Sequence, residues 1–269
     1  MMFIRKLFIF SWLQALSCIF PLIIFGALAL TKIVELPVLP RYDWILLICL
    51  LAQAAMIISK LETMDELKVI CMFHIIGLGL EIFKVHMGSW SYPEAAWSKV
   101  FGVPLYSGFM YASVASYICQ AWRRLQLRIT GWPRSVYAVA ISTAIYLNFF
   151  THHFIGDYRW LLMLLLIAVF LRCTVYFTLE ERTLRMPLLL SFLLIGFFIW
   201  VAENVTTFLG AWKYPNQEEV WHLVHIGKIS SWFLLVVISV IIVAQLKHVK
   251  MGDATAPKGV PTNKWESRI

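Results

Sequence analysis

Residues 81–93 read EIFKVHMGSWSYP, and residues 203–215 read ENVTTFLGAWKYP. Each stretch puts a glutamate near the end of a long apolar run and continues with Gly, Trp, Tyr and Pro at the same offsets, 122 residues apart. Two scarce aromatic residues matched at fixed offsets indicate an internal duplication. We therefore expect two halves of similar architecture, each with one glutamate and one aromatic turn.

Composition favours a membrane protein for this duplicated chain. Of its 269 residues, 61% are hydrophobic and 14% are charged, whereas soluble domains have roughly 45–50% apolar and about 25% charged residues. Backbone groups in lipid must find hydrogen-bond partners within their own segment, so the apolar segments should be helices. The sequence predicts an all-α fold, a polytopic membrane helix bundle.

Eight apolar segments approach or exceed the ~20 residues that cross a bilayer. An even number of spans in each half leaves both copies running in the same direction, so we expect two parallel four-helix halves, about 1–125 and 126–246. Together they should form a single transmembrane domain, 1–246, followed by a flexible basic cytoplasmic tail, 247–269. The expected spans are about 7–30, 42–59, 67–84, 100–121, 134–151, 158–179, 186–209 and 222–246.

Positive residues predict the orientation. Most of the 23 Lys and Arg residues fall in the N-terminus, in alternate connections and in the C-terminal tail. Both termini are therefore expected in the cytoplasm, with the protein in the cell (cytoplasmic) membrane and both aromatic turns toward the outer leaflet. The net charge of +8 then reflects orientation and attraction to the lipid bilayer, and no nucleic-acid partner is predicted.

Glu81 and Glu203 are the main candidates for chemistry, because an ionisable group inside a span is costly and typically faces the bundle interior. In the functional interpretation they act as general acid and base, and a desolvated carboxylic acid delivers a proton to an apolar substrate. In the structural interpretation each glutamate caps or pairs with a neighbouring helix, with Lys84 or Lys228 as partners. Both interpretations stay open.

The aromatic residues of the two turns also have two interpretations. They are the expected composition of an interfacial aromatic belt. Beside the glutamates they would instead shape a substrate pocket and stabilise a developing carbocation by cation–π contact. The residues concerned are Trp90, Tyr92, Trp212 and Tyr214.

Histidines gather on the same predicted side of the membrane. His222 and His225 are three residues apart, on one face of the expected last helix, and are candidates to tune protonation or hold water beside the glutamates. His152, Asp157 and Lys228 are expected to contact substrate. The spacing matches no strong metal signature, and the sequence leaves the cofactor unknown. The residues that could hold a metal are His152, His153, His222 and His225.

These motifs make the chain similar to a bacterial family of integral membrane proteins, the domain-of-unknown-function 817 group. The likeness covers nearly the whole length, and the family implies no activity. Its strongest parts are LEIFKVHMGSWSYPE (80–94), GVPLYSGFMYASVASYI (102–118), AENVTTFLGAWKYPNQ (202–217) and HIGKISSWFLLV (225–236).

A more distant likeness suggests a chemistry. An acidic residue ending a span, Gly-x-Trp-x-Tyr, and Gly-Val-Pro-Leu at the next span resemble the bisanhydrobacterioruberin hydratases and the heterodimer-type lycopene cyclases. The cyclases carry Pro-Leu-Glu-Glu where this chain has Pro-Leu-Tyr-Ser, which favours the hydratase-like comparison. The matching positions are Glu81, Gly88, Trp90, Tyr92, Gly102, Val103, Pro104 and Leu105.

Three functions follow as hypotheses. The first is a membrane-embedded enzyme, hydratase- or isomerase-like, acting on an isoprenoid, carotenoid-like or other lipid substrate by acid–base chemistry. The second is a proton-coupled small-solute transporter, because two parallel halves with intramembrane glutamates also suit a carrier. The third is a non-catalytic subunit of a membrane complex.

Overall fold

The computed structural model describes residues 2–255, with side chains from 4 to 244. It is mainly helical, as the composition predicts. The helices are α1 (Met2–Ser17), α2 (Ile19–Ile33), α3 (Arg41–Ile58), α4 (Met64–His86), α5 (Tyr106–Arg124), α6 (Ser135–Thr151), α7 (Arg159–Phe170), α8 (Leu188–Phe208) and α9 (Lys228–Thr255), with a 3₁₀ turn η1 at Pro215–Gln217.

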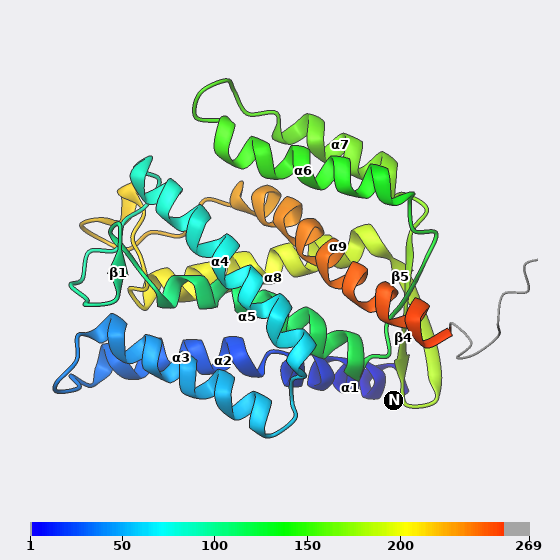
Figure 1. Ribbon diagram of the computed structural model, residues 1–269, viewed down its shortest axis with the longest axis horizontal. Helices are drawn as coiled ribbons and strands as arrows, with labels where there is room; N and C mark the ends of the chain where they lie inside the picture. The colour runs from blue at the N-terminus through cyan, green and yellow to red at the C-terminus, as the bar shows by residue number, and fades with distance from the viewer. Residues whose placement is uncertain (1, 256–269) are drawn as a thin grey trace, which may run out of the picture.

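The helices run back and forth between two ends of one bundle (Figure 1). At the left end α4 and α8 finish and α5 begins, so both aromatic turns lie there, while α9 begins nearer the middle of the bundle. The first described residues of α1 and the last of α9 lie toward the opposite end. Both aromatic turns therefore lie at the end of the bundle away from the first described residues of α1.

Within the described residues, three helices are long and apolar enough to cross a membrane: α3, α4 and α8. The pair α1 and α2 would make a fourth if counted as one span, although it is bent by 66°. Many large apolar side chains are exposed, among them Leu51, Ile75 and Phe198, which suits helices facing lipid. The remaining four of the eight expected spans stay a prediction.

Short strands depart from the all-helical prediction. A hairpin of β1 (Lys99–Val100) and β2 (Val103–Pro104) occupies the start of the expected span 100–121, so its helix begins at Tyr106. A three-stranded sheet at the other end joins β3 (Arg128–Thr130), β4 (Thr174–Leu179) and β5 (Arg182–Pro187), in the order β3-β4-β5.

The span expected at 158–179 is wrong in its second part, because α7 ends at Phe170 and residues 174–179 form β4. The segment TVYFTL alternates partly buried and buried side chains along the strand, and β-branched and aromatic residues pack well on a pleated surface. Phe177 and Leu179 pack against Ala121 and Leu125 of the α5 end. A count of apolar residues does not distinguish such an alternating strand from part of an apolar helix.

The last span begins later than predicted. Residues 221–226 are not helical, and α9 starts at Lys228. Helix α9 continues to Thr255, so the first part of the expected tail is helical. The tail from residue 256 onward lies outside the described residues.

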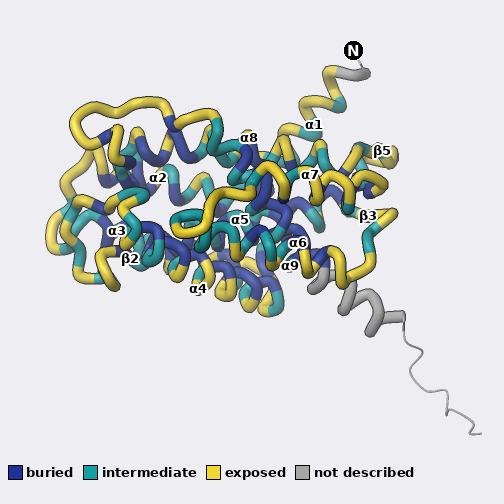
Figure 2. The backbone as a smooth tube through the Cα atoms, turned by 90° about the horizontal axis from the view of Figure 1, so that it is seen from above, coloured by how far each residue is buried: buried dark blue, intermediate teal, exposed yellow. Residues whose placement is uncertain are grey.

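Burial is concentrated in the middle of the bundle, while the connections at its ends are exposed (Figure 2). Helix α5 contributes small buried residues, including Ala112, Ala115 and Ser116, to this interior. Small side chains allow close approach between helices in a membrane. The α4–α5 and α8–α9 pairs each carry one glutamate and its turn toward the same end of the bundle.

Candidate functional site

The two glutamate-bearing helices end in the same way. Gly88 follows α4 and Gly210 follows α8, both with positive φ, of 66° and 78°. The next amide turns back to the helix in both cases, from Ser89 to the Lys84 carbonyl at 2.9 Å and from Ala211 to the Thr206 carbonyl at 3.0 Å. Glycine suits this left-handed cap, which explains the matched glycine in the two motifs.

The two turns pair with each other. Ser91 and Lys213 form an isolated antiparallel bridge, with both amides donating to the opposite carbonyl at 2.9 Å. These two residues occupy the same position in the two motifs, 122 residues apart. Equivalent residues that bond reciprocally imply a local two-fold relation between the turns.

Glu81 accepts hydrogen bonds from three neutral donors. Trp90 Nε1 and Tyr92 Oη donate to its Oε2 at 2.6 and 2.8 Å, and Tyr111 Oη of α5 donates to its Oε1 at 2.8 Å. The residue is only 4% exposed. Each donor favours the ionised carboxylate, which offsets part of the cost of burying it.

Glu203 is held in a similar way and is 3% exposed. Tyr214 donates to its Oε1, and Trp232 Nε1 of α9 donates to its Oε2 at 2.7 Å. Trp232 takes the role that Tyr111 has in the first half, from the helix that follows the turn. Trp212 is buried and interacts with the Tyr214 hydroxyl.

The two carboxyl groups share one site. The rings of Trp90 and Tyr214, which each bind one glutamate, are 5.9 Å apart and nearly perpendicular. Lys228 Nζ lies 5.4 and 4.7 Å from these two ring centroids. Burial, and then the Glu203 charge, raises the pKa of Tyr214, to which Glu81 also contributes. The phenol therefore stays a neutral donor.

The lysines that the structural interpretation invoked do not pair with these glutamates. Among the described side chains, neither Lys84 nor Lys228 lies within ion-pair distance of a carboxylate. The partners of both glutamates are indole and phenol groups. The site thus holds two buried carboxyls with neutral donors, and lysines nearby that are not bonded to them.

His152, His153 and Asp157 surround Lys84 at the edge of this site. Lys84 Nζ lies 3.0 Å from His153 Nε2 and 3.4 Å from His152 Nε2. Asp157 instead pairs with Arg159 at 2.9 Å. Burial alone would raise the pKa of Asp157, but hydrogen bonds from the Arg159 amide and Asn148, with the Arg159 charge, lower it overall.

Acid is expected to weaken the fold through His152 and His153. Burial, and then the Lys84 charge, lowers the pKa of both imidazoles, so the unfolded chain, with histidine pKa values near 6.5, protonates first. Stability is therefore full above about pH 6.5 and is lost as the pH falls from there toward the folded-state values. Unfolding midpoints in lipid discs between pH 7.5 and 5 should fall, and fall less in the variant His152→Gln/His153→Gln. Equal losses in both proteins would contradict this assignment.

His222 and His225 are exposed and lie in the non-helical segment before α9. The expectation that they share a helix face is therefore wrong. His225 Nδ1 accepts a bond from the Gly227 amide at 3.0 Å, and the His222 carbonyl accepts one from Gln217. Within the described part of the chain, no group of three or more His, Cys, Asp or Glu residues could hold a metal ion.

Sequence reasoning missed two donors, Tyr111 and Trp232. Tyr111 lies 30 residues beyond Glu81, in the following helix. The only local signal was Gly77, where a Cβ would come within 2.4 Å of the Tyr111 ring. Trp232 sits 29 residues beyond Glu203. At the 122-residue offset Tyr111 corresponds to Phe233 and Trp232 to Met110, so comparing the two halves does not reveal these donors.

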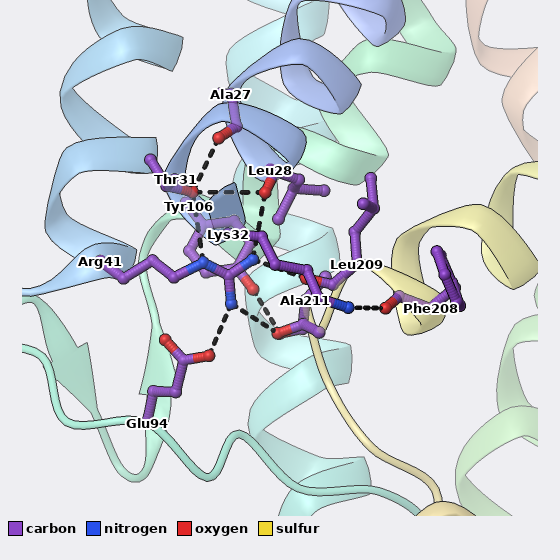
Figure 3. A network of polar contacts seen from close by, with 11 residues as sticks. Ala27, Leu28, Thr31, Lys32, Arg41, Glu94, Tyr106, Phe208, Leu209 and Ala211 are labelled. Carbon is purple, nitrogen blue, oxygen red and sulfur yellow. Dashed lines mark hydrogen bonds and ion pairs between the residues drawn. The ribbon is translucent and has the colours of Figure 1, made fainter. Parts of the chain in front are cut away.

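Three side chains of the first half, Arg41, Lys32 and Tyr106, bind the end of α8 and together form what is called the clamp below (Figure 3). Arg41, the first residue of α3, donates to the carbonyls of Leu209 at 2.6 Å and Gly210 at 3.3 Å. The same guanidinium binds Glu94 at 2.5 Å. Lys32 and Tyr106 donate to the flanking carbonyls of Phe208 and Ala211. These bonds satisfy carbonyls that a helix end leaves without partners.

Replacing Arg41 by methionine is expected to lower the free energy of unfolding by about 2–4 kcal/mol, because partly buried carbonyls and Glu94 lose a charged donor. The measurement is chemical or thermal unfolding in detergent. Lys68→Met is the control, since Lys68 is exposed and its ion pair with Asp65 should be worth less than about 1 kcal/mol. Equal losses in the two variants would refute the clamp.

The family model described as "Protein of unknown function (DUF817)" matches residues 6–240. "Uncharacterized protein YoaT" of Bacillus subtilis (strain 168) is 62% identical over 252 residues, covering 94% of this chain and 96% of that protein. No solved structure matches. These matches do not bear on the carotenoid-enzyme likeness, which stays a hypothesis.

Proposed function

The chain belongs to the family described as "Protein of unknown function (DUF817)", which names no activity, and from the site geometry we propose a membrane-embedded enzyme that transfers protons to and from a double bond of an apolar lipid. The observation that carries the proposal is the pair of buried glutamates, Glu81 and Glu203, in one aromatic site with neutral donors. Intramembrane carboxyls of this kind are functional candidates by default.

The proposed reaction is a hydration or isomerisation. In hydration, one glutamic acid gives its proton to an alkene carbon, and the oxygen of a water bonds to the other carbon. The proton released from that water goes to the second glutamate, so that one water adds in total. In isomerisation, the second carboxylate removes a proton from the neighbouring carbon, and the mass is unchanged. Positioned acid–base groups contribute roughly 10²–10⁴-fold to such steps.

The substrate class follows from the surroundings. Trp90 is partly exposed, while Tyr92 and Tyr214 are buried beside the carboxyls. Indole and phenol rings offer an apolar wall and a face for positive charge that develops during protonation. We propose an isoprenoid or related unsaturated lipid, which would reach the site from the bilayer on the side of Trp90.

The same proposal includes location and ancestry. The protein is taken to lie in the cell membrane as one duplicated domain with both termini in the cytoplasm. The matched glycine caps and the reciprocal Ser91–Lys213 bridge support duplication. The positive residues and the shared end of the bundle for the described terminal helices support the orientation.

Mass spectrometry of total lipid extracts tests the proposal. Extracts are compared from cells with wild type, with the double variant Glu81→Gln/Glu203→Gln, and with empty vector, in hosts with and without carotenoid precursors. A species found with wild type alone supports catalysis, heavier by one water for hydration or of equal mass for isomerisation. Identical profiles, with folded protein in the membrane, would overturn the enzyme proposal. Proton-linked uptake, or co-purification of a partner complex, would then identify a carrier or a subunit.

A further inference from the structure

Three basic side chains lie at the ends of three helices beside the glutamate site. Lys84 is in the last turn of α4, Arg159 begins α7 and Lys228 begins α9. Arg159 Nη1 donates to Ser230 Oγ at 3.2 Å, which brings the guanidinium to the first turn of α9. Lys84 interacts electrostatically with both other cations. The three cations of this cluster therefore lie close enough to act on one another. The acidic groups that also act on them are Asp157, Glu203 and Glu81.

Among the described side chains Lys84 forms no direct ion pair, although the charge of Asp157 acts on it. Lys84 is 4% exposed, and its Nζ contacts two imidazole nitrogens, at 3.0 and 3.4 Å. His152 Nδ1 lies 3.0 Å from the Asn148 carbonyl, so this nitrogen carries the ring proton. The facing Nε2 then accepts a bond from the ammonium and adds no negative charge. Asp157 is itself paired with Arg159, so the counter-charge available to the buried Lys84 is shared, and burying a cation in this way is costly.

The other two cations differ in their partners. Arg159 pairs with Asp157 at 2.9 Å. Lys228 rests against the rings of Trp90 and Tyr214. Within the described side chains it forms no direct ion pair, although the charges of Glu203 and Glu81 act on it. A positive Lys228 so close to these rings would oppose a carbocation formed there. An anion bound between Lys84 and Lys228 would remove that conflict.

We propose that Lys84, Arg159 and Lys228 bind a phosphate-type anionic head group carried by the lipid substrate. This inference rests on the proposed function and names its substrate class, a polyprenyl or similar unsaturated phosphate ester. Phosphates are recognised by several cationic donors from separate elements, and arginine and lysine are the usual ones. Lys84 lies one helical turn beyond Glu81, so a head group at Lys84 places the first carbons of its chain near the two glutamates.

Binding measured without turnover tests the inference. The full chain in phosphatidylcholine discs is titrated with farnesyl phosphate, farnesol or inorganic phosphate, and the tryptophan emission is followed because Trp90 adjoins Lys228. Farnesyl phosphate should bind saturably and at least about tenfold more tightly than farnesol, as expected for charge-assisted contacts. Lys84→Met and Arg159→Met should each raise Kd about tenfold or more. Lys84→Arg should keep binding, and so should the control Lys32→Met outside the cluster.

The three titrated ligands distinguish the possible sources of the anion. Inorganic phosphate that competes only weakly identifies a lipid head group, while phosphate that binds as tightly as farnesyl phosphate identifies a soluble phosphate ester in the same cluster. Equal binding of farnesol and farnesyl phosphate overturns the inference, as does an unchanged Kd in folded Arg159→Met and Lys84→Met. The titration is repeated in Glu81→Gln/Glu203→Gln, which should still bind. If the double variant binds farnesyl phosphate and no wild-type extract contains a product, the proposed reaction is refuted while the anion site is supported.

Discussion

Product formation is expected to fall by about 10²–10⁴-fold when Glu81 becomes glutamine, and by a similar factor in Glu203→Gln. Glutamine has nearly the same size and keeps one acceptor oxygen, but it neither gives nor takes a proton in the reaction. In the wild-type protein Trp90, Tyr92 and Tyr111 all donate to Glu81. The amide nitrogen of glutamine is itself a donor, so one of these three groups would lose its acceptor. The loss should therefore appear mainly in kcat, with some loss of stability.

The two substitutions together should cost little more than either one alone, because residues that act as one unit are not additive. The measurement is the rate of product formation in lipid discs, normalised to folded protein. Glu62→Gln is the matched control. Glu62 is also buried, at 2% exposure, and accepts a hydrogen bond from Gln53 at 2.5 Å, but it lies between α3 and α4, at the opposite end of α4. A single glutamate variant that keeps half of the wild-type rate would contradict the proposed roles.

Gly77→Ala is expected to destabilise the fold by about 2–4 kcal/mol, whereas Gly79→Ala should be neutral or slightly stabilising. A Cβ at Gly77 would lie 2.4 to 2.6 Å from three side-chain atoms of Tyr111, so the ring or helix α5 must move. A Cβ at Gly79 meets nothing within 4 Å. The same chemical change two residues apart on one helix therefore separates the packing effect from helix propensity.

The effect of Gly77→Ala should also reach the chemistry. A displaced Tyr111 no longer donates to Glu81 at 2.8 Å, so the rate should fall along with the unfolding midpoint. Tyr111→Phe removes only the hydroxyl and is expected to cost about 0.5–1.5 kcal/mol. Unfolding curves in detergent for the three variants provide the test. Equal stabilities of Gly77→Ala and Gly79→Ala would show that α4 and α5 do not pack at this distance.

A similar close approach exists in the second half. A Cβ at Gly196 would come within 3.0 Å of the Phe233 backbone nitrogen on α9, one residue from Trp232, which donates to Glu203. In both halves, a glycine on the glutamate-bearing helix brings the next helix close enough to supply a donor. Glycine is suited to this role because it has no Cβ.

The sequence by itself determined the mainly helical architecture and the apolar helices that could cross a membrane, while it left two interpretations of the aromatic turns open. Tyr92 and Tyr214 reach Glu81 and Glu203 across the same 11 residues. A helix end, a glycine cap and a short turn leave little freedom over that length, which explains why the contact is the same in both halves.

Only the tertiary structure decided which residues complete the site. Tyr111 and Trp232 come from the following helices, and no local pattern indicates which face a helix turns toward its neighbour. The strand at 174–179 and the non-helical segment around His222 likewise escaped an apolar count. Hydropathy reports how apolar a segment is, whereas the conformation of the segment depends on what it packs against. Strand β4, for example, packs against the end of α5.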